Sequence, residues 1–190
     1  MQSRVRDVIA QVERFMQTAD DALALPRDAA EFMHALVLAT GARRAVEIGT
    51  SYGYSGLWIA AALAENGGRL ITIDRLDHKT EAARGYFRSA GLDHLVAFRT
   101  GPAVDVLPTI TGPVDFVLND ADKENCRRYV EILEDRLSNL AVVLTDNILS
   151  HKEELADFVS WIRGHASFAS ALVPVGSGME LSVRRNRMRV

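Results

Sequence analysis

The chain has 190 residues, of which 48% are hydrophobic and 25% are charged, and its formal net charge is −3 at pH 7. This length and composition are typical of one soluble domain with its own core. The small negative charge argues against nucleic acid and against an anionic membrane, so we expect a small molecule as the partner.

Cys126 is the single cysteine, which excludes a disulfide bond within the chain. The first residues, MQSRVRDVIAQVERF, carry a charge every few positions and lack the apolar core of a signal peptide. No apolar run approaches the roughly 18 residues that a membrane span needs. We therefore expect a cytoplasmic protein that does not enter a membrane.

Residues 1–43 are predicted to be mainly helical. Apolar side chains recur at helical spacing in the first segment, at Val5, Val8, Ile9, Val12, Phe15 and Met16. This stripe must be covered, either by the rest of the chain or by a second copy in a homodimer. A second helix is predicted within residues 22–42, with Pro26 and Asp28 near its start and Gly41 just past its end.

From Ala45 onward, short apolar runs alternate with amphipathic segments, which is typical of βαβ units. The predicted strands are 45–48, 69–73, 95–99, 114–119 and 140–145, and the predicted helices are 54–65, 78–90, 102–109, 124–137 and 152–164. Two further apolar runs flank residues 176–178 (Gly-Ser-Gly), which predicts an antiparallel hairpin at the sheet edge. We expect one domain over 1–190, of the doubly wound α/β class, with a seven-stranded, mostly parallel, Rossmann-like sheet in 44–190.

Residues 45–74 have the anatomy of half a nucleotide-binding site: a strand, a glycine-containing turn, a helix and a second strand. The glycines at Gly49, Gly53 and Gly56 lack the close G-x-G pair that lets a dinucleotide pyrophosphate approach the backbone. Glu47 would repel a pyrophosphate but attract an ammonium group or an orienting hydroxyl. The predicted cofactor therefore carries positive charge.

Asp74 ends the second strand of this unit, where an acidic residue accepts hydrogen bonds from ribose hydroxyls in many nucleotide-binding folds. Adenosine with a cationic amino-acid tail fits both Asp74 and Glu47, and this describes S-adenosylmethionine. Its carboxylate could bind Ser55 and the free amides at the helix start. The alternative is that the glycines only tighten a turn and that Asp74 is a solvated strand end.

Polar residues also follow the fourth and fifth predicted strands, whose carboxyl ends share one edge of the sheet with the Glu47 turn. Asp120, Asp146 and Asn147 offer three hard oxygen ligands, which suit Mg²⁺ and also Mn²⁺ or Ca²⁺. No histidine or cysteine cluster suggests zinc. Taken alone, each of these residues is also typical of a turn or a helix cap, the expected role of Asp122.

Lys123 lies in the first of these two loops. A divalent cation beside it would favour the neutral amine, which makes Lys123 a candidate general base for a hydroxyl proton. The cation would also lower the pKa of a coordinated hydroxyl, so the two effects act on one oxygen. A substrate with two adjacent oxygens is expected.

The stretches EIGTSYGYS, ITIDR, FVLNDADKENCRRY and VVLTDN together resemble the metal-dependent O-methyltransferases of the catechol and caffeoyl-coenzyme A type. This is O-methyltransferase family 3, within the class I S-adenosylmethionine fold. The resemblance is dense over residues 43–150 and looser over 173–185. It implies methyl transfer from S-adenosylmethionine to a hydroxyl of a small catechol-like or vicinal dihydroxy acceptor, with a divalent metal.

Carried over to this chain, the resemblance implies cofactor contacts at Glu47, Gly49, Thr50, Ser51, Gly53, Ser55, Asp74, Arg75, Ala103, Val104 and Asp120. It implies a metal triad of Asp120, Asp146 and Asn147, with Lys123 and Asp120 at the catalytic centre. Two departures border the substrate side and leave the acceptor open. Only about 44 residues precede the first strand, and the segment after Asn147 lacks the tryptophan and glycine of many members.

Three other functions are weighed against this one. A related enzyme could methylate a modified uridine in tRNA, which the net charge disfavours. A non-catalytic adenosyl-binding module would not need Lys123 beside a metal, and an NAD-dependent dehydrogenase would need the missing glycine pair.

Tyr54, Trp58 and Cys126 are interpreted as packing residues and His151 as a surface residue at a helix start. A solvated basic tail is expected at Arg184, Arg185, Arg187 and Arg189.

Overall fold

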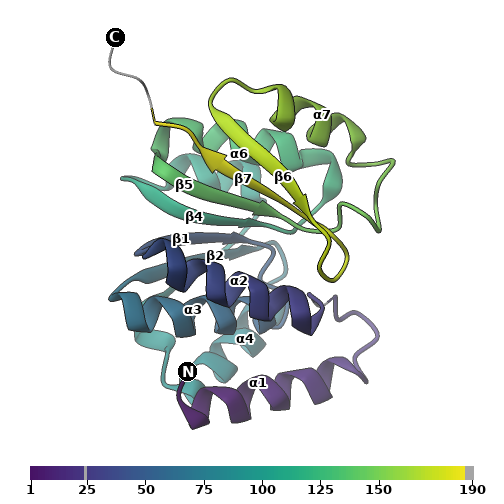
Figure 1. The fold of residues 1–190 in the computed structure, drawn as a ribbon. Coiled ribbons are helices and arrows are strands. Elements are labelled where there is room, and N and C mark those ends of the chain that lie inside the picture. The colour runs from purple at the N-terminus through teal and green to yellow at the C-terminus, as the bar shows by residue number, and fades with distance from the viewer. Residues whose placement is uncertain (24, 187–190) are drawn as a thin grey trace.

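The computed structural model describes residues 1–23 and 25–186. They form one seven-stranded sheet in the order β3-β2-β1-β4-β5-β7-β6 (Figure 1). The strands are β1 (Arg44–Ile48), β2 (Arg69–Asp74), β3 (Val96–Thr100), β4 (Val114–Asn119), β5 (Leu137–Thr145), β6 (Phe168–Val173) and β7 (Met179–Arg184). Strands β1 to β5 are parallel, and β7 is antiparallel to both β5 and β6. The predicted fold class is confirmed.

Helices cover both faces of the sheet (Figure 1). They are α1 (Ser3–Met16), α2 (Arg27–Thr40), α3 (Tyr54–Asn66), α4 (Asp77–Ala90), α5 (Ala103–Val106), α6 (Cys126–Leu133) and α7 (Ala156–Gly164). One core cluster joins α1 to α4 to one face, through residues such as Ala45 and Phe116. The other joins α5 to α7 to the opposite face, through Val46 and Val117. This alternation along buried strands is what a parallel sheet covered on both sides requires.

The apolar stripe of α1 lies against the chain's own domain. Val5, Val8, Ile9 and Val12 are buried, and α1 packs on α3 and α4. In the structure, the apolar stripe of α1 is therefore covered by the rest of the same chain. None of the helices in the described part of the chain is both long and apolar enough to cross a membrane.

Several predicted boundaries differ from the structure. The helix expected over 124–137 ends at Leu133, after which a 3₁₀ turn leads into β5 at Leu137 rather than at residue 140. The helix expected over 102–109 is an α-helix over Ala103–Val106 that continues as a 3₁₀ helix over Leu107–Thr109. Helix α7 begins at Ala156, four residues later than predicted. The early start of β5 comes from its pairing with β4, where the register shifts between Val114 and Phe116. Pairing between strands, rather than local propensity, sets this boundary.

The prediction of a solvated tail is wrong for Arg184. This residue is only 3% exposed, because it lies in β7 opposite Phe168 of the edge strand β6. Arg185 is exposed, as expected. Arg187 and Arg189 lie outside the described residues.

Leu140 combines two unfavourable features within β5. Its φ angle is 62°, in the left-handed region, and its side chain is 60% exposed. A leucine in that region costs roughly 1–2 kcal/mol, whereas glycine adopts it freely. Because the side chain is exposed, its removal takes away little buried apolar surface.

We expect Leu140→Gly to stabilise the protein by about 0.5–1 kcal/mol in urea unfolding, after the greater unfolded-state entropy of glycine is subtracted. Leu172→Gly is the matched control, since Leu172 is also exposed in a strand but has no positive φ angle. The control should be destabilised. Destabilisation of both variants alike would show that Leu140 is not strained.

An ion pair between the exposed Arg163 and the buried Glu180 holds α7 to β7. The Glu180 side chain has no exposed surface, and Arg163 donates two hydrogen bonds to it, at 2.7 Å from Nε to Oε1 and 2.7 Å from Nη2 to Oε2. Two hydrogen bonds of this kind offset the cost of removing the charged carboxylate from water. Removal of the arginine alone would leave that charge unpaired.

Arg163→Met is therefore expected to lower the free energy of unfolding by about 2–3 kcal/mol, since Arg163 itself keeps some solvent contact. Arg128→Met is the control, because Arg128 forms an exposed pair with Glu131 at 3.8 Å. That change should cost about 0.5 kcal/mol or less. Equal losses in the two variants would contradict a special role for the pair at the buried Glu180.

Candidate functional site

Three strand ends converge at the carboxyl edge of the sheet. The amide of Asp120 donates to the carbonyl of Ile48 at 3.0 Å, which ties the end of β4 to the end of β1. The amide of Asp146 donates to the carbonyl of Asn119 at 3.3 Å, which ties β5 to β4. Gly49, with a φ angle of 105°, lies directly against the Asp120 carbonyl and leaves no space for a Cβ atom. The loops predicted to carry the chemistry are therefore neighbours.

The loop after β1 is shaped by Asp74. Its carboxylate accepts hydrogen bonds from the Ser51 amide at 2.7 Å and from the Leu76 amide at 2.9 Å. Ser51 has a φ angle of 45°, and its hydroxyl oxygen is buried without a hydrogen-bond partner among the described residues. A strained residue with an unpaired buried hydroxyl is a feature of ligand sites. A polar ligand bound at this loop could form a hydrogen bond with that hydroxyl.

Glu47 is fully buried below the start of α3. Its Oε1 accepts a hydrogen bond from Ser55 and its Oε2 one from Thr72, both at 2.6 Å. Burial raises the pKa of Glu47 to about 7, although these two hydrogen bonds act to lower it. A Cβ atom at Gly56 would lie 2.7 Å from Glu47 Oε2, so the glycine allows the helix to approach the carboxylate.

Ser55 thus contacts Glu47, and its expected contact with a cofactor carboxylate stays a prediction. The remaining predicted cofactor residues border the same edge. Thr50 is buried and Gly53 precedes α3 with a φ angle of 84°, whereas Arg75 is exposed. Ala103 and Val104 begin α5 directly after residues 101–102, and the Gly101 amide donates to the Asp74 carbonyl at 2.9 Å. Their roles also stay predictions.

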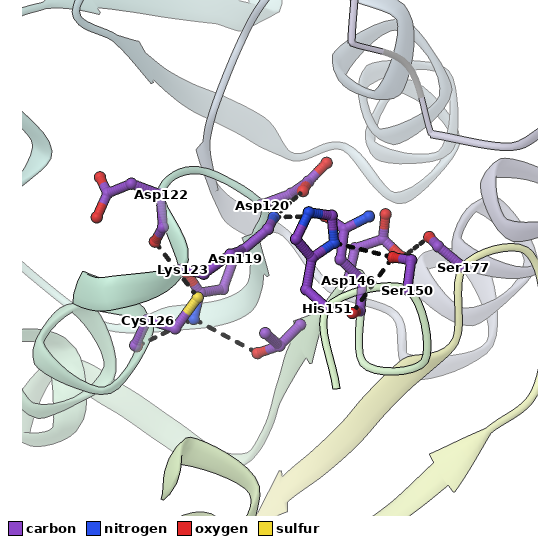
Figure 2. A network of polar contacts seen from close by, with 11 residues as sticks. Asn119, Asp120, Asp122, Lys123, Cys126, Asp146, Ser150, His151 and Ser177 are labelled. Atoms are coloured by element: carbon purple, nitrogen blue, oxygen red, sulfur yellow. Dashed lines mark hydrogen bonds and ion pairs between the residues drawn. The ribbon is translucent and has the colours of Figure 1, made fainter. Parts of the chain in front are cut away.

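Lys123 joins the two loops that carry the predicted metal ligands (Figure 2). Its Nζ donates to Asp120 Oδ1 at 3.2 Å and also to Asn147 Oδ1. Asn147 has a φ angle of 69°, a conformation that asparagine tolerates better than most residues. Asp146, which is 1% exposed, accepts a hydrogen bond from the Ser177 hydroxyl at 2.7 Å. Oxygen atoms from two loops therefore surround one positive charge.

The electrostatics of these acids favour a further cation. Burial raises the pKa of Asp120 to about 6; Lys123 lowers it, and the neighbouring charge of Asp146 raises it. Burial also raises the pKa of Asp146, against the hydrogen bond from Ser177. No three His, Cys, Asp or Glu side chains cluster as metal ligands in the part of the chain that the structure describes. Two carboxylates and the Asn147 amide form a hard oxygen set that fits Mg²⁺, Mn²⁺ or Ca²⁺.

Other predictions from the sequence can be compared with the structure. Asp122 is a cap residue as expected, since its Oδ1 accepts from the Asn125 amide at 3.2 Å. Cys126 is buried, and burial raises the pKa of its thiol to about 12, which fits a packing role. Tyr54 and Trp58 belong to the core.

Sequence reasoning missed two neighbours of the candidate ligands. His151 is half-buried, its Nδ1 lies 3.0 Å from Ser150 Oγ, and a positive charge on it would lower the pKa of Asp146. Ser177 comes from the turn between β6 and β7. The Gly-Ser-Gly sequence predicts that turn, but nothing in it signals contact with the loop after β5.

Comparisons with known proteins identify relatives of this chain. A sequence model of a family described as O-methyltransferase matches residues 3–160. A catechol O-methyltransferase of Mycobacterium tuberculosis is 38% identical over 137 residues, which are 69% of this chain and 62% of that protein. A caffeoyl-CoA O-methyltransferase of Medicago sativa is 34% identical over 128 residues, 64% of this chain and 51% of that protein. The chain thus matches less than two thirds of the length of either relative.

A solved structure extends the likeness over nearly the whole chain. The O-methyltransferase from Bacillus cereus in complex with SAH superposes with a TM-score of 0.82 at 27% sequence identity. The superposition covers 97% of this chain and 92% of that one.

The buried carboxyl of Glu47 should make stability depend on pH. Its pKa rises from an ordinary value of 4.5 to about 7, so the folded protein binds a proton there that the unfolded chain releases above pH 4.5. The free energy of unfolding contributed by this group therefore falls as pH rises through that interval. Glu47→Gln keeps the shape of the neutral carboxyl and removes the titration.

We expect the wild type to lose on the order of 2 kcal/mol relative to Glu47→Gln between about pH 5 and about pH 8, in the absence of ligand. Urea unfolding of both proteins in the same buffers measures this, because the other groups titrate in both. A constant difference between the two curves would contradict the raised pKa.

Proposed function

Since this chain belongs to the O-methyltransferase family, we propose that it transfers a methyl group from S-adenosylmethionine to a hydroxyl oxygen of a small acceptor with two adjacent oxygens, such as a catechol. The observation that carries the proposal is the convergence of Asp120 and Asn147 on Lys123, beside Asp146. A general base and hard oxygen ligands at one edge suit the activation of a hydroxyl group.

The cofactor part of the proposal rests on the loop after β1. The loop presents the unpaired hydroxyl of Ser51 and lies between the carboxyl groups of Glu47 and Asp74. Two acidic groups suit a ligand with a cationic end and a ribose. The Bacillus cereus neighbour, in complex with SAH, supports the same cofactor class.

A divalent cation held by Asp120, Asp146 and Asn147 would lower the pKa of a coordinated acceptor hydroxyl. The protein's own contribution is to receive the proton and to hold the partners in line. Lys123 Nζ contacts Asp120 and Asn147, so it lies beside the oxygens that would hold the acceptor hydroxyl. The neutral amine can then accept the hydroxyl proton.

The methyl group passes to the acceptor oxygen as its bond to sulfur breaks, and the bonding electron pair stays on sulfur. No covalent bond to the protein is needed. Catalysis then depends on alignment, because a fixed approach of the oxyanion to the methyl carbon removes much of the entropic cost. The short backbone links between β1, β4 and β5 supply this rigidity.

We expect Lys123→Met to lower kcat for catechol methylation by about 10²- to 10⁴-fold while S-adenosylmethionine affinity is kept, as the loss of a general base predicts. Lys152→Met is the control, because Lys152 is an exposed lysine in the nearby turn. Methylation of catechol and caffeoyl esters is measured with Mg²⁺, with Mn²⁺ and with a chelator.

The same assay tests the metal. Asp146→Ala and the chelator should each abolish most of the activity. Full activity in either case would show that the hydroxyl is activated without the proposed ligands. Activity confined to RNA, with binding that weakens steeply with salt, would transfer the proposal to a different acceptor class.

A further inference from the structure

The turn between β6 and β7 reaches the proposed metal site through one side chain. Ser177 lies in this turn, and its hydroxyl donates to Asp146 Oδ1 at 2.7 Å (Figure 2). Asp146 is 1% exposed, so solvent offers little competition for that oxygen. The hydroxyl therefore helps to orient the Asp146 carboxylate, together with the backbone of Asn147.

The turn itself is fixed on the side of the candidate ligands. The amide of Ile148 donates to the carbonyl of Gly178 at 2.9 Å, and the amide of Leu149 donates to the carbonyl of Ser177 at 2.9 Å. A Cβ atom at Gly178, whose φ angle is 83°, would collide with the Leu149 side chain. The turn thus packs against the segment that follows Asn147.

The opposite side of the turn is held by α2. The amide of Gly176 donates to Asp28 Oδ2 at 3.0 Å. A Cβ atom at Gly176 would lie 2.9 Å from the Ala29 Cβ and 3.0 Å from Pro26. With both neighbours of Ser177 fixed in this way, its backbone has little freedom to move away from Asp146.

A carboxylate has two oxygens, and a cation can bind one or both of them. Here Oδ1 of Asp146 already accepts the Ser177 hydrogen bond. Hydrogen bonds of this kind, made to a ligand rather than to the metal, orient the ligand and typically change metal affinity by 10- to 100-fold.

We propose that Ser177 is a positioning residue for the divalent cation: it holds Oδ1 of Asp146 and so presents Oδ2 to the metal. This inference rests on the proposed function, because it assumes that Asp146 is a metal ligand. It adds a residue from the C-terminal hairpin to a site otherwise formed by the loops after β4 and β5.

The test compares two substitutions of nearly equal shape. Ser177→Thr keeps the hydroxyl and Ser177→Val replaces it with a methyl group, so any strain from the added volume is shared. Ser170→Ala is the control, because the Ser170 hydroxyl lies in the same hairpin but donates to Ser182 at 2.9 Å. Binding of Mn²⁺ alone to each full-length protein is measured by calorimetric titration, together with the melting temperature and the affinity for S-adenosylhomocysteine without metal.

We expect Mn²⁺ to bind about tenfold more weakly to Ser177→Val than to Ser177→Thr and the wild type, as loss of a ligand-orienting hydrogen bond predicts. Affinity for S-adenosylhomocysteine should be alike in all four proteins. Equal Mn²⁺ affinity in the valine and threonine variants would overturn the inference, as would an equal loss in Ser170→Ala. If the wild type binds no Mn²⁺, the metal site of the proposed function fails as well, and that result differs from the other two.

Discussion

The contact between Gly49 and the carbonyl of Asp120 is the constraint on which the candidate site depends. Position 49 has no room for a side chain, and its φ angle of 105° is one that glycine adopts readily. Because β1 and β4 are parallel neighbours, this contact brings the loop after β1 against the loop after β4. The proposed methyl donor and acceptor sites are therefore adjacent because of this backbone contact.

Around this contact the protein buries several acidic groups with few positive partners. Burial raises the pKa values of Glu47, Asp120 and Asp146. Among the described residues, Lys123 is the only positively charged side chain that donates a hydrogen bond to one of these carboxylates. Such an arrangement costs stability while no ligand is bound and regains it when positively charged ligands bind. The strain at Ser51 and Asn147 falls in the loops after β1 and β5. The site is thus organised for cations at the expense of the unliganded fold.

The strands β1 to β4 could be predicted because each is a short, mostly apolar run between helical segments. The start of β5 could not, since Leu137 joins the strand only through its register with Val114 of β4. The prediction for Arg184 is wrong for a similar reason. An arginine near the end of a sequence is typical of an exposed side chain, whereas Arg184 lies in β7 opposite Phe168 of β6 and is 3% exposed. The candidate ligands followed from their places after strands. Ser177 did not, because its contact with Asp146 joins segments that no local pattern relates.

The hydrogen bond between Asp28 and the Gly176 amide spans 148 positions of the chain. On a ribosome, the helix that carries Asp28 is made long before the hairpin it must hold. The loops after β1, β4 and β5 can meet earlier, but the turn that steadies them arrives with the last strand. Chain closure of this range is slow compared with local folding. A nascent chain would therefore hold its buried acidic groups together, without their full support, until synthesis of the domain is almost finished.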